Sequence, residues 1–439
     1  MAGTDRVILS FISIPLFHDH TLSMLSIPVL GGIVGYVINR TGVWMLYQPI
    51  EFTGVHVPGL AAIARRLPRK LRQIPGIMHG GIGWQGIIPS RAAKMGSIAV
   101  DKQIGEVGSP AEFYERFDPD QIGEHILASS DQEIRELIER TVEREHPELW
   151  RELTPRAREA LYQRVREQLP GIVSDITEEI GEHIDELMDV KHMVMSRLVA
   201  DRALTNKLFH EVGRKEFKFI IRFGFVFGFL CGIPTIFLIE AFPEWWLLPL
   251  VESVIGYATN WIGIWMIYEP VEPRKVGPFK LQGLFPRRQH DAAEVYGEVI
   301  SQDIVTLENI GRELMHGPRS DRTRQLIVTA MRPAMDRAVG SAGVLVRAAY
   351  GSAEYEAMQE SVATEAVEHT LTPLQDPEFS RRGAGAVREL FTERMREMSP
   401  GEFVETLRSA TREDEWLLVA HGALFGTIGG LLHYVIFGV

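Results

Sequence analysis

The chain has 439 residues, a hydrophobic content of 45% and a net charge of -12. This acidic balance argues against nucleic acid as a partner, because neutralising phosphates requires a basic face. The single cysteine, Cys231, lies in an apolar run, so no internal disulfide can form and a redox site is not expected. Apolar runs of membrane length alternate with long, charged, helix-forming stretches, which indicates a membrane protein.

Residues 1–20 contain a short apolar run from Val7 to Phe17, which ends at His18. This run resembles the core of a signal peptide, but no small-residue cleavage site follows it. We expect an interfacial or partly inserted helix here, with a separate span as the alternative.

One stretch of the sequence occurs twice. Gly35–Ile50 and Gly256–Val271 are identical at 8 of 16 positions without a gap. The shared residues are Gly, Tyr, Asn, Gly, Trp, Met, Tyr and Pro, in that order. Such a match indicates an internal duplication that sets the organisation of the whole chain.

The duplication predicts an all-α integral membrane protein with two similar halves. Repeat 1 covers residues 21–240, with spans at 22–47 and 217–239 around a soluble helical region at 51–216. Repeat 2 covers residues 243–439, with spans at 245–267 and 416–437 around a soluble helical region at 271–414. Each span has the roughly 20 apolar residues needed to cross a bilayer.

The soluble regions are expected to form helical hairpins or a coiled-coil-like stalk. An apolar residue recurs every three or four positions over residues 172–198, which predicts one long amphipathic helix. No stretch shows a convincing strand period.

The second span of each repeat carries glycine every four residues, so the glycines lie on one face of the helix. Small residues let a neighbouring backbone approach closely, which predicts helix packing at these positions. The residues are Gly224, Gly228, Gly232, Gly422, Gly426 and Gly430.

A second shared feature is an apolar pair followed by Pro and a cation, at Ile87–Arg91 and Leu284–Arg288. Two interpretations remain open. The segment either dips into the headgroup layer, with its cations reaching phosphates, or is a turn followed by a helix start. The candidate headgroup-binding residues are Arg91, Arg287 and Arg288, together with the juxtamembrane cluster Arg65, Arg66, Arg69 and Lys70.

Two spans per repeat give both halves the same orientation, related by a pseudo-two-fold axis along the membrane normal. Cations are concentrated next to the spans on the side of the soluble regions, and the turn at 241–244 has none. The positive-inside rule therefore places the helical regions in the cytoplasm of a bacterial inner membrane.

These motifs resemble a known family. A span with Gly-Tyr-x-x-Asn that ends in Met-x-x-x-Pro, a Gly-x-x-Pro-x-Arg turn and long charged helices are similar to the bacterial membrane family "domain of unknown function 445". At Arg40 the sequence departs from the Trp usual there, and Gln48 and Glu269 replace a common Arg before Pro. The resemblance implies an inner-membrane location and supplies no catalytic residues.

Polar residues inside the predicted spans are candidate functional groups. Asn39 and Asn260 lie at the same depth in the two halves, and Tyr36 and Tyr257 lie three residues before them. Each Asn is expected to bond across a helix interface or to a backbone carbonyl. Alternatively, the two form a paired polar site on the pseudo-two-fold axis, which the tyrosines share.

Two ionisable groups, Glu252 and Arg40, also lie within spans. Arg40 aligns with Trp261, nine positions from Glu252 or about 13 Å along a helix axis, so we expect no ion pair between them. Arg40 is expected to reach toward cytoplasmic headgroups. Glu252 is the best single candidate for a proton- or cation-linked role.

No cofactor or metal is predicted. Gly81–Gly86 matches a dinucleotide fingerprint by letter, but neither a strand before it nor an acidic partner after it is expected. The carboxylates around His183 are more typical of a solvated helix face than of a metal site. The sequence shows no nucleophile–base set, so we do not expect an enzyme.

Two functions fit these features. The first is a membrane-anchored scaffold that interacts with anionic lipids and presents its cytoplasmic helices to partner proteins or to other copies of itself. The second is an oligomeric transporter or channel with a polar site near the pseudo-two-fold axis. A lipid-modifying enzyme has no support beyond acidic and histidine residues near the membrane.

Overall fold

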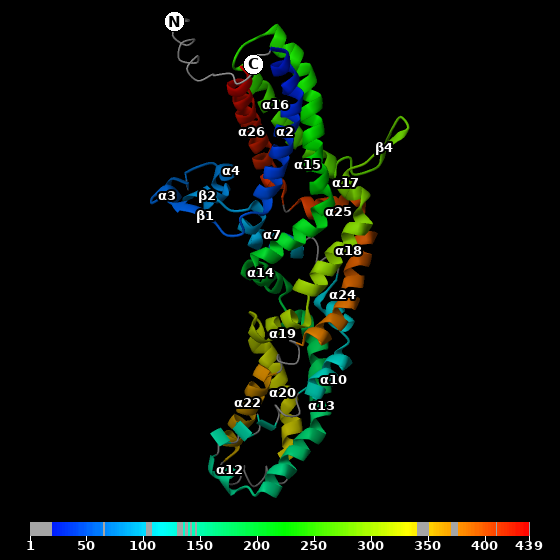
Figure 1. The fold of residues 1–439 in the computed structure, drawn as a ribbon. Helices are drawn as coiled ribbons and strands as arrows, with labels where there is room; N and C mark the ends of the chain where they lie inside the picture. The colour runs from blue at the N-terminus through cyan, green and yellow to red at the C-terminus, as the bar shows by residue number, and fades with distance from the viewer. Residues whose placement is uncertain are drawn as a thin grey trace. The chain divides into compact units, whose positions relative to one another are not determined.

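The computed structural model describes residues 20–64, 66–101, 108–129, 135–136, 139–140, 143–144, 147–339, 351–369, 376–409 and 411–438. Within these ranges the chain is almost entirely helical (Figure 1), which confirms the all-α class. The expected interfacial helix lies outside the described residues, except for its last position. The chain divides into two compact units, with residues 1–98, 201–295 and 395–439 in unit 1 and residues 99–200 and 296–394 in unit 2.

Unit 1 contains the four predicted spans. They are α2 (His20–Tyr47), α15 (Arg202–Ala241), α16 (Leu247–Tyr268) and α26 (Glu415–Phe437), which follows the short helix η3 (Arg412–Asp414). All four are long and apolar enough to cross a membrane. Helix α15 begins well before the predicted span, because Asp201 caps it by accepting a hydrogen bond from Leu204 N, and its first turns pack within unit 1 through buried residues such as Leu208.

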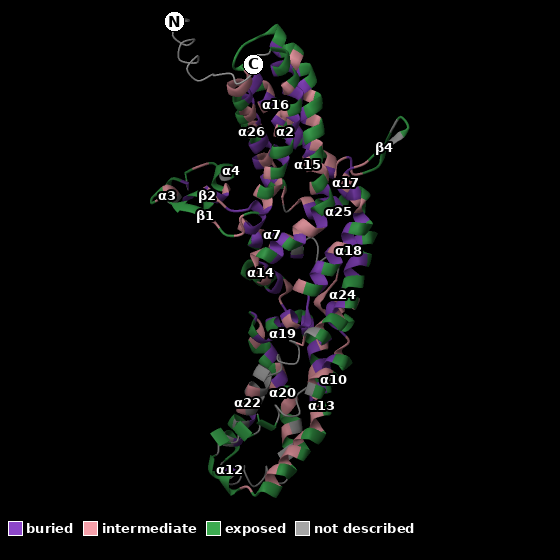
Figure 2. Cartoon of the chain, in the orientation of Figure 1, coloured by how far each residue is buried: buried purple, intermediate pink, exposed green. Residues whose placement is uncertain are grey.

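The four span helices pack as two antiparallel pairs, α2 with α15 and α16 with α26 (Figure 1). Their facing sides are buried, whereas their outer sides are exposed and apolar (Figure 2). The outer faces expose Leu25, Val226, Leu250 and Leu424 among others. This pattern suits helices whose outer surface contacts lipid.

Each repeat has a small β-hairpin after its first span, which the sequence analysis did not predict. Strand β1 (Thr53–His56) pairs with β2 (Gly81–Trp84), and β3 (Arg274–Val276) pairs with β4 (Phe279–Leu281), both antiparallel. Short helices α3 (Leu60–Ala64), α4 (Arg69–Arg72) and α5 (Pro75–Met78) lie between β1 and β2. The strands have only three or four residues each, which is too short to show an alternating pattern and explains why they were missed.

The fingerprint at Gly81–Gly86 follows the short helix α5 and not a strand, as expected, and its first four residues are themselves strand β2. That strand belongs to an antiparallel hairpin rather than to a parallel βαβ unit. Gly54 and Gly83 face each other across the hairpin, where a Cβ on either would collide with the opposite backbone. The glycines thus serve close strand pairing, and a dinucleotide site has no structural basis here.

The two Pro turns form short helices, α6 (Ile87–Ser90) and α17 (Leu284–Arg287). Gly86 N donates to Pro49 O and Gly283 N donates to Pro270 O, both at 2.9 Å. Their apolar residues, including Ile88, are buried against the protein and do not face a bilayer. The helix-start interpretation is therefore the one that the structure supports.

The remaining helices of unit 1 surround these turns. They are α7 (Ala92–Ala99), α18 (Gln289–Val299) and α25 (Pro400–Arg408). Gln289 of α18 donates to the backbone oxygens of Met395 and Met398, which fixes the end of a neighbouring helix.

Unit 2 is a set of helices with an apolar core. It contains α9 (Pro110–Arg116), α10 (Pro119–Ser129), α12 (Pro147–Glu152), α13 (Pro155–Leu187), α14 (Val190–Ala200), η2 (Ile300–Ile304), α19 (Leu307–His316), α20 (Ser320–Val339), α22 (Ser352–His369) and α24 (Pro377–Glu397). Phe113 and Phe391 stack in the core with ring centroids 5.4 Å apart. Helix α13 packs along α10 and α20, which fits the expected helical hairpins.

The single long helix predicted over residues 172–198 is wrong, because it is broken into α13 and α14. Met188 has an extended backbone, and the side chain of Asp189 accepts a hydrogen bond from His192 N at 2.9 Å. This is an N-cap that starts a new helix. Arg319 donates to the backbone oxygens of Asp185, Glu186 and Met188, and so binds the free carbonyls at the end of α13.

Candidate functional site

The two Asn residues in the spans join the helices of each pair. Asn39 Nδ2 donates to Ile220 O at 2.6 Å, and Asn260 Nδ2 donates to Leu418 O at 2.5 Å. Both side chains are buried. The two bonds occupy matching positions in the two repeats. Each Asn is therefore used at a helix interface within its own repeat, and the described contacts do not bring the two amides together at a shared polar site.

The six glycines on the second spans lie at the same crossings. A Cβ on Gly224 would meet Gly35 O, and a Cβ on Gly422 would meet Gly256 O. The other four glycines meet the backbone of the first spans in the same way, at Gly31, Pro28, Glu252 and Pro249. These contacts show why both glycine series are needed for close backbone packing.

Glu252 places a carboxyl group at the α16–α26 crossing, where the α2–α15 crossing has an uncharged glycine. It is the counterpart of Gly31 and is 5% exposed. Its Oε1 lies 3.4 Å from the place that a Cβ on Gly31 would take, beside the Gly31–Gly228 crossing. Among the described residues it forms no hydrogen bond or ion pair. A carboxyl group in this position is costly for a membrane span, so Glu252 remains a candidate functional group.

Arg40, Tyr36 and Tyr257 lie on the exposed side of their helices. Arg40 Nη1 lies 3.4 Å from Tyr36 Oη, within hydrogen-bonding distance. The tyrosines therefore do not share a site with the buried Asn residues, as the alternative interpretation supposed. The exposed position of Arg40 leaves its guanidinium available to groups outside the protein.

Arg91 and Arg288 require a correction. Arg91 Nη2 lies 2.6 Å from Asp414 Oδ1, with both side chains almost fully buried, and also donates to Gln73 O at 2.9 Å. Arg288, which is partly exposed, forms an ion pair with the buried Glu216 and lies 3.6 Å from a carboxylate oxygen of Asp291. The guanidinium groups that we expected at phosphates are thus held by carboxylates inside unit 1, and we no longer assign them to headgroups.

The other predicted basic residues fall into three groups. Arg66, Lys70 and Arg287 are exposed, and none has a carboxylate partner within the part of the chain that the structure describes. Arg65 lies outside the described residues, and the side chain of Arg69 is not described. Arg66 and Lys70 belong to the β1–β2 lobe (residues 51–84), which also exposes Val55, Ile63 and Ile82.

The β3–β4 hairpin repeats this combination of cations and exposed apolar groups. It exposes Arg274, Lys275, Lys280 and Leu281. Cationic and apolar side chains together are typical of segments that lie at a membrane surface.

Histidines in the last span join it to the first span of the other repeat. His421 Nε2 lies 3.2 Å from Thr41 Oγ1, and His433 Nε2 lies 3.3 Å from Ser26 Oγ. These hydroxyl partners were not predicted from the sequence. A single sequence contains no signal that shows which hydroxyl of one span faces a histidine of another span.

A surface groove of about 540 Å³ lies between α16 and α26 in repeat 2. Its lining combines aromatic and charged side chains, with Tyr257, Trp261 and Trp265 from α16 and Arg408, Arg412, Glu415 and Trp416 from the region of α26. The cations are already paired, because Arg408 bonds both carboxylate oxygens of Glu415 and Arg412 lies near Glu405. This groove is consequently close to neutral.

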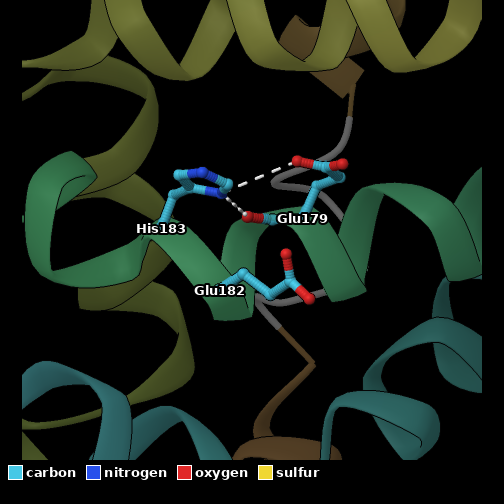
Figure 3. Close-up of side chains that lie close together, drawn as sticks. All are labelled: Glu179, Glu182 and His183. Atoms are coloured by element: carbon cyan, nitrogen blue, oxygen red, sulfur yellow. Dashed lines mark hydrogen bonds and ion pairs between the residues drawn. The ribbon is translucent and has the colours of Figure 1, made fainter.

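In unit 2, Glu179, Glu182 and His183 of α13 lie close enough to hold a metal ion (Figure 3). His183 Nδ1 lies 3.1 Å from Glu179 O and 3.6 Å from a carboxylate oxygen of Glu179. All three side chains are exposed. An exposed acidic group of this kind is common on helix surfaces, and we assign it no metal.

Comparison with known proteins finds bacterial membrane proteins. A UPF0754 membrane protein of Geobacillus kaustophilus is 35% identical over 79 residues, which are 17% of this chain and 21% of that protein. Those of Shouchella clausii and Staphylococcus epidermidis are 33% identical over 70 residues and 31% identical over 81 residues. The chain thus spans only about a fifth of the length of these relatives.

No family model matches the chain, and no solved structure matches it. The matched relatives and the four apolar helices indicate a bacterial membrane protein from an uncharacterised family. These relatives are named as UPF0754 membrane proteins, and none of their names mentions the "domain of unknown function 445" family that the motifs resemble.

Proposed function

We propose that this protein is a non-enzymatic membrane scaffold that binds anionic headgroups of the cytoplasmic leaflet and presents its helical unit to partner proteins or to further copies of itself. The observation that carries the proposal is the pair of hairpin lobes that follow the first spans. Each lobe exposes both cations and large apolar side chains, Lys70 and Ile63 in the first and Lys280 and Leu281 in the second. A basic juxtamembrane group contributes about 1 kcal/mol per cation at an anionic surface.

The distribution of cations also supports an orientation of the spans in the membrane. Both lobes leave the spans at the ends marked by Tyr47 and Tyr268, whereas the turn between α15 and α16 has Glu244 and no cation. We propose on this basis that the lobes and the helical unit are cytoplasmic in a bacterial inner membrane. We also propose membership of the "domain of unknown function 445" family, on the strength of the repeated motifs.

Hydrogen–deuterium exchange of the full-length protein in nanodiscs tests the lipid interaction. We expect slower amide exchange in residues 51–84 and 274–281 when phosphatidylglycerol is added to phosphatidylcholine. The triple variant Arg66→Gln/Lys70→Gln/Arg72→Gln should lose this protection in the first lobe and retain it in the second. Equal exchange rates of both wild-type lobes in the two lipid compositions contradict the proposal.

A transporter or channel is the second candidate, and Glu252 is the observation that favours it. Its carboxyl group is buried at the helix crossing beside Gly31, where the other repeat has no side chain. Ionisable groups in this position mark ion or proton pathways in many membrane proteins. A proteoliposome proton-flux assay with Glu252→Gln tests this function, because flux equal to that of the wild type removes its support.

A further inference from the structure

The two span pairs are built alike, so the groove of repeat 2 identifies an equivalent surface in repeat 1. The contact Asn39–Ile220 of repeat 1 corresponds to Asn260–Leu418 of repeat 2, and Gly35–Gly224 corresponds to Gly256–Gly422, with the same spacing along each span. The counterparts of the groove residues therefore lie on α2 and α15, and they include Arg40, Trp44, Arg214, Lys218 and Arg222.

This α2–α15 surface is basic where its counterpart is aromatic and neutral. Arg40 replaces Trp261, Lys218 replaces Trp416, and Arg222 replaces Ala420. All three cations are exposed, and within the described ranges none has a carboxylate partner. Arg214 adds a fourth cation, which lies 3.6 Å from Glu211. The surface therefore carries an excess of positive charge that the protein does not neutralise.

The position of Arg40 along its helix places its guanidinium within reach of lipid headgroups. Arg40 lies seven residues before the end of α2, or roughly 10 Å along the helix, and its long side chain can reach the interface. Trp44, one turn further on, is 53% exposed, as expected for an aromatic residue at the membrane surface. Toward the membrane centre the surface becomes apolar, with exposed Ile33 and Phe225, and Phe225 packs on Gly32 of α2.

We propose that the α2–α15 surface binds one anionic diacyl phospholipid, whose phosphate contacts Arg40, Lys218 and Arg222 and whose acyl chains lie along Ile33 and Phe225. This inference deepens the proposed lipid-binding function and rests on it. It assigns a discrete site on the spans, separate from the hairpin lobes. Guanidinium and ammonium groups that converge on one phosphate give charge-assisted hydrogen bonds, and the apolar surface below them accepts the chains.

Native mass spectrometry of the full-length protein in detergent tests the site, with phosphatidylglycerol and phosphatidylcholine as the added lipids. We expect the first phosphatidylglycerol to bind more tightly than phosphatidylcholine. The variant Arg40→Gln/Lys218→Gln/Arg222→Gln should weaken that first binding step by roughly 100-fold, at about tenfold or less per cation. The charge-conserving variant Arg40→Lys/Lys218→Arg/Arg222→Lys should keep most of the affinity.

A matched triple variant in unit 2, Arg156→Gln/Arg164→Gln/Arg324→Gln, removes the same charge from exposed helix positions and should leave the first binding step unchanged. If the lobe variant Arg66→Gln/Lys70→Gln/Arg72→Gln abolishes that step and the α2–α15 variant does not, the site is in the lobe and the inference is wrong, while the lipid-binding function stands. If the wild-type protein shows no preference for phosphatidylglycerol and its lobes exchange equally in both nanodisc compositions, both proposals fail. Competition by millimolar inorganic phosphate would show a free anion site and overturn the assignment to a lipid.

Discussion

Arg91 Nη2 lies 2.6 Å from Asp414 Oδ1, although the arginine follows the first span of repeat 1 and the aspartate precedes the second span of repeat 2. Arg288 and Glu216 form the reciprocal pair. The distance between the two groups defines an ion pair. Neither carboxylate oxygen of Asp414 accepts a hydrogen bond from a described donor. These two pairs join the repeats, whereas the Asn and Gly contacts join the spans within each repeat.

The first prediction concerns this buried pair. Arg91→Met should lower the free energy of unfolding by about 3–5 kcal/mol, because it leaves the carboxylate of Asp414 buried without its cation. The double variant Arg91→Met/Asp414→Leu should recover much of that loss. Denaturation in mixed micelles measures both values. Additive losses in the double variant would show that the pair is not coupled, and Arg412→Gln, at an exposed pair, should change little.

The spans and the duplication could be predicted because both depend on local features of the sequence. Apolar length identified each span, and the match of Gly35–Ile50 with Gly256–Val271 identified the repeat. The prediction of an interface role for Asn39 also followed from a general rule, since a buried amide must find a partner. The break between α13 and α14 could have been predicted from Asp189, which is a favourable N-cap.

The cross-repeat contacts could not be predicted in this way. The positions of Arg91 and Arg288 beside the membrane favour a headgroup contact, and only the fold brings Asp414 and Glu216 to them. The hairpins were missed because strands of three or four residues give no periodic signal. Likewise, the basic character of the α2–α15 surface becomes evident only when the repeat 2 groove shows which residues share a face.

The second prediction concerns glycine packing. Gly224→Ala should destabilise the protein by about 2 kcal/mol or more, because the added Cβ would collide with Gly35 O and with the amide of Asn39. Gly263→Ala is the matched control on another span, since its Cβ would meet only Ile220 carbons at 3.8 and 4.0 Å. It should be neutral or stabilising by up to about 1 kcal/mol, because Ala favours helix. Equal effects of the two substitutions would contradict the close crossing.

The third prediction separates structural from functional roles of the paired amides. Asn39→Ala and Asn260→Ala should each lower the unfolding free energy by about 0.5–1.5 kcal/mol, the range for hydrogen bonds between membrane helices. Their effects should add in the double variant, because the two bonds lie at different crossings. Denaturation in mixed micelles provides the measurement. A strongly non-additive double variant would instead indicate that the two amides form one coupled site.

The fourth prediction concerns the pH dependence of unit 2. Tyr114 Oη donates to Thr177 O at 3.1 Å, and burial raises the pKa of Tyr114 well above the ordinary value of a tyrosine. A raised pKa in the folded state means that folding favours the neutral phenol. Its contribution is therefore fully present below about pH 10 and is lost as the pH rises from there toward the folded-state pKa.

Tyr114→Phe removes this titration together with one hydrogen bond. It should cost about 1 kcal/mol at neutral pH and should make the loss of stability above pH 10 less steep. Tyr162→Phe is the comparison, because Tyr162 is only partly buried and should change the alkaline slope less. Hydrogen exchange of α9 and α13 between pH 8 and 11, corrected for the intrinsic exchange rate, reports the stability of unit 2 directly. An alkaline slope in Tyr114→Phe equal to that of the wild type would show that the phenol does not titrate on unfolding.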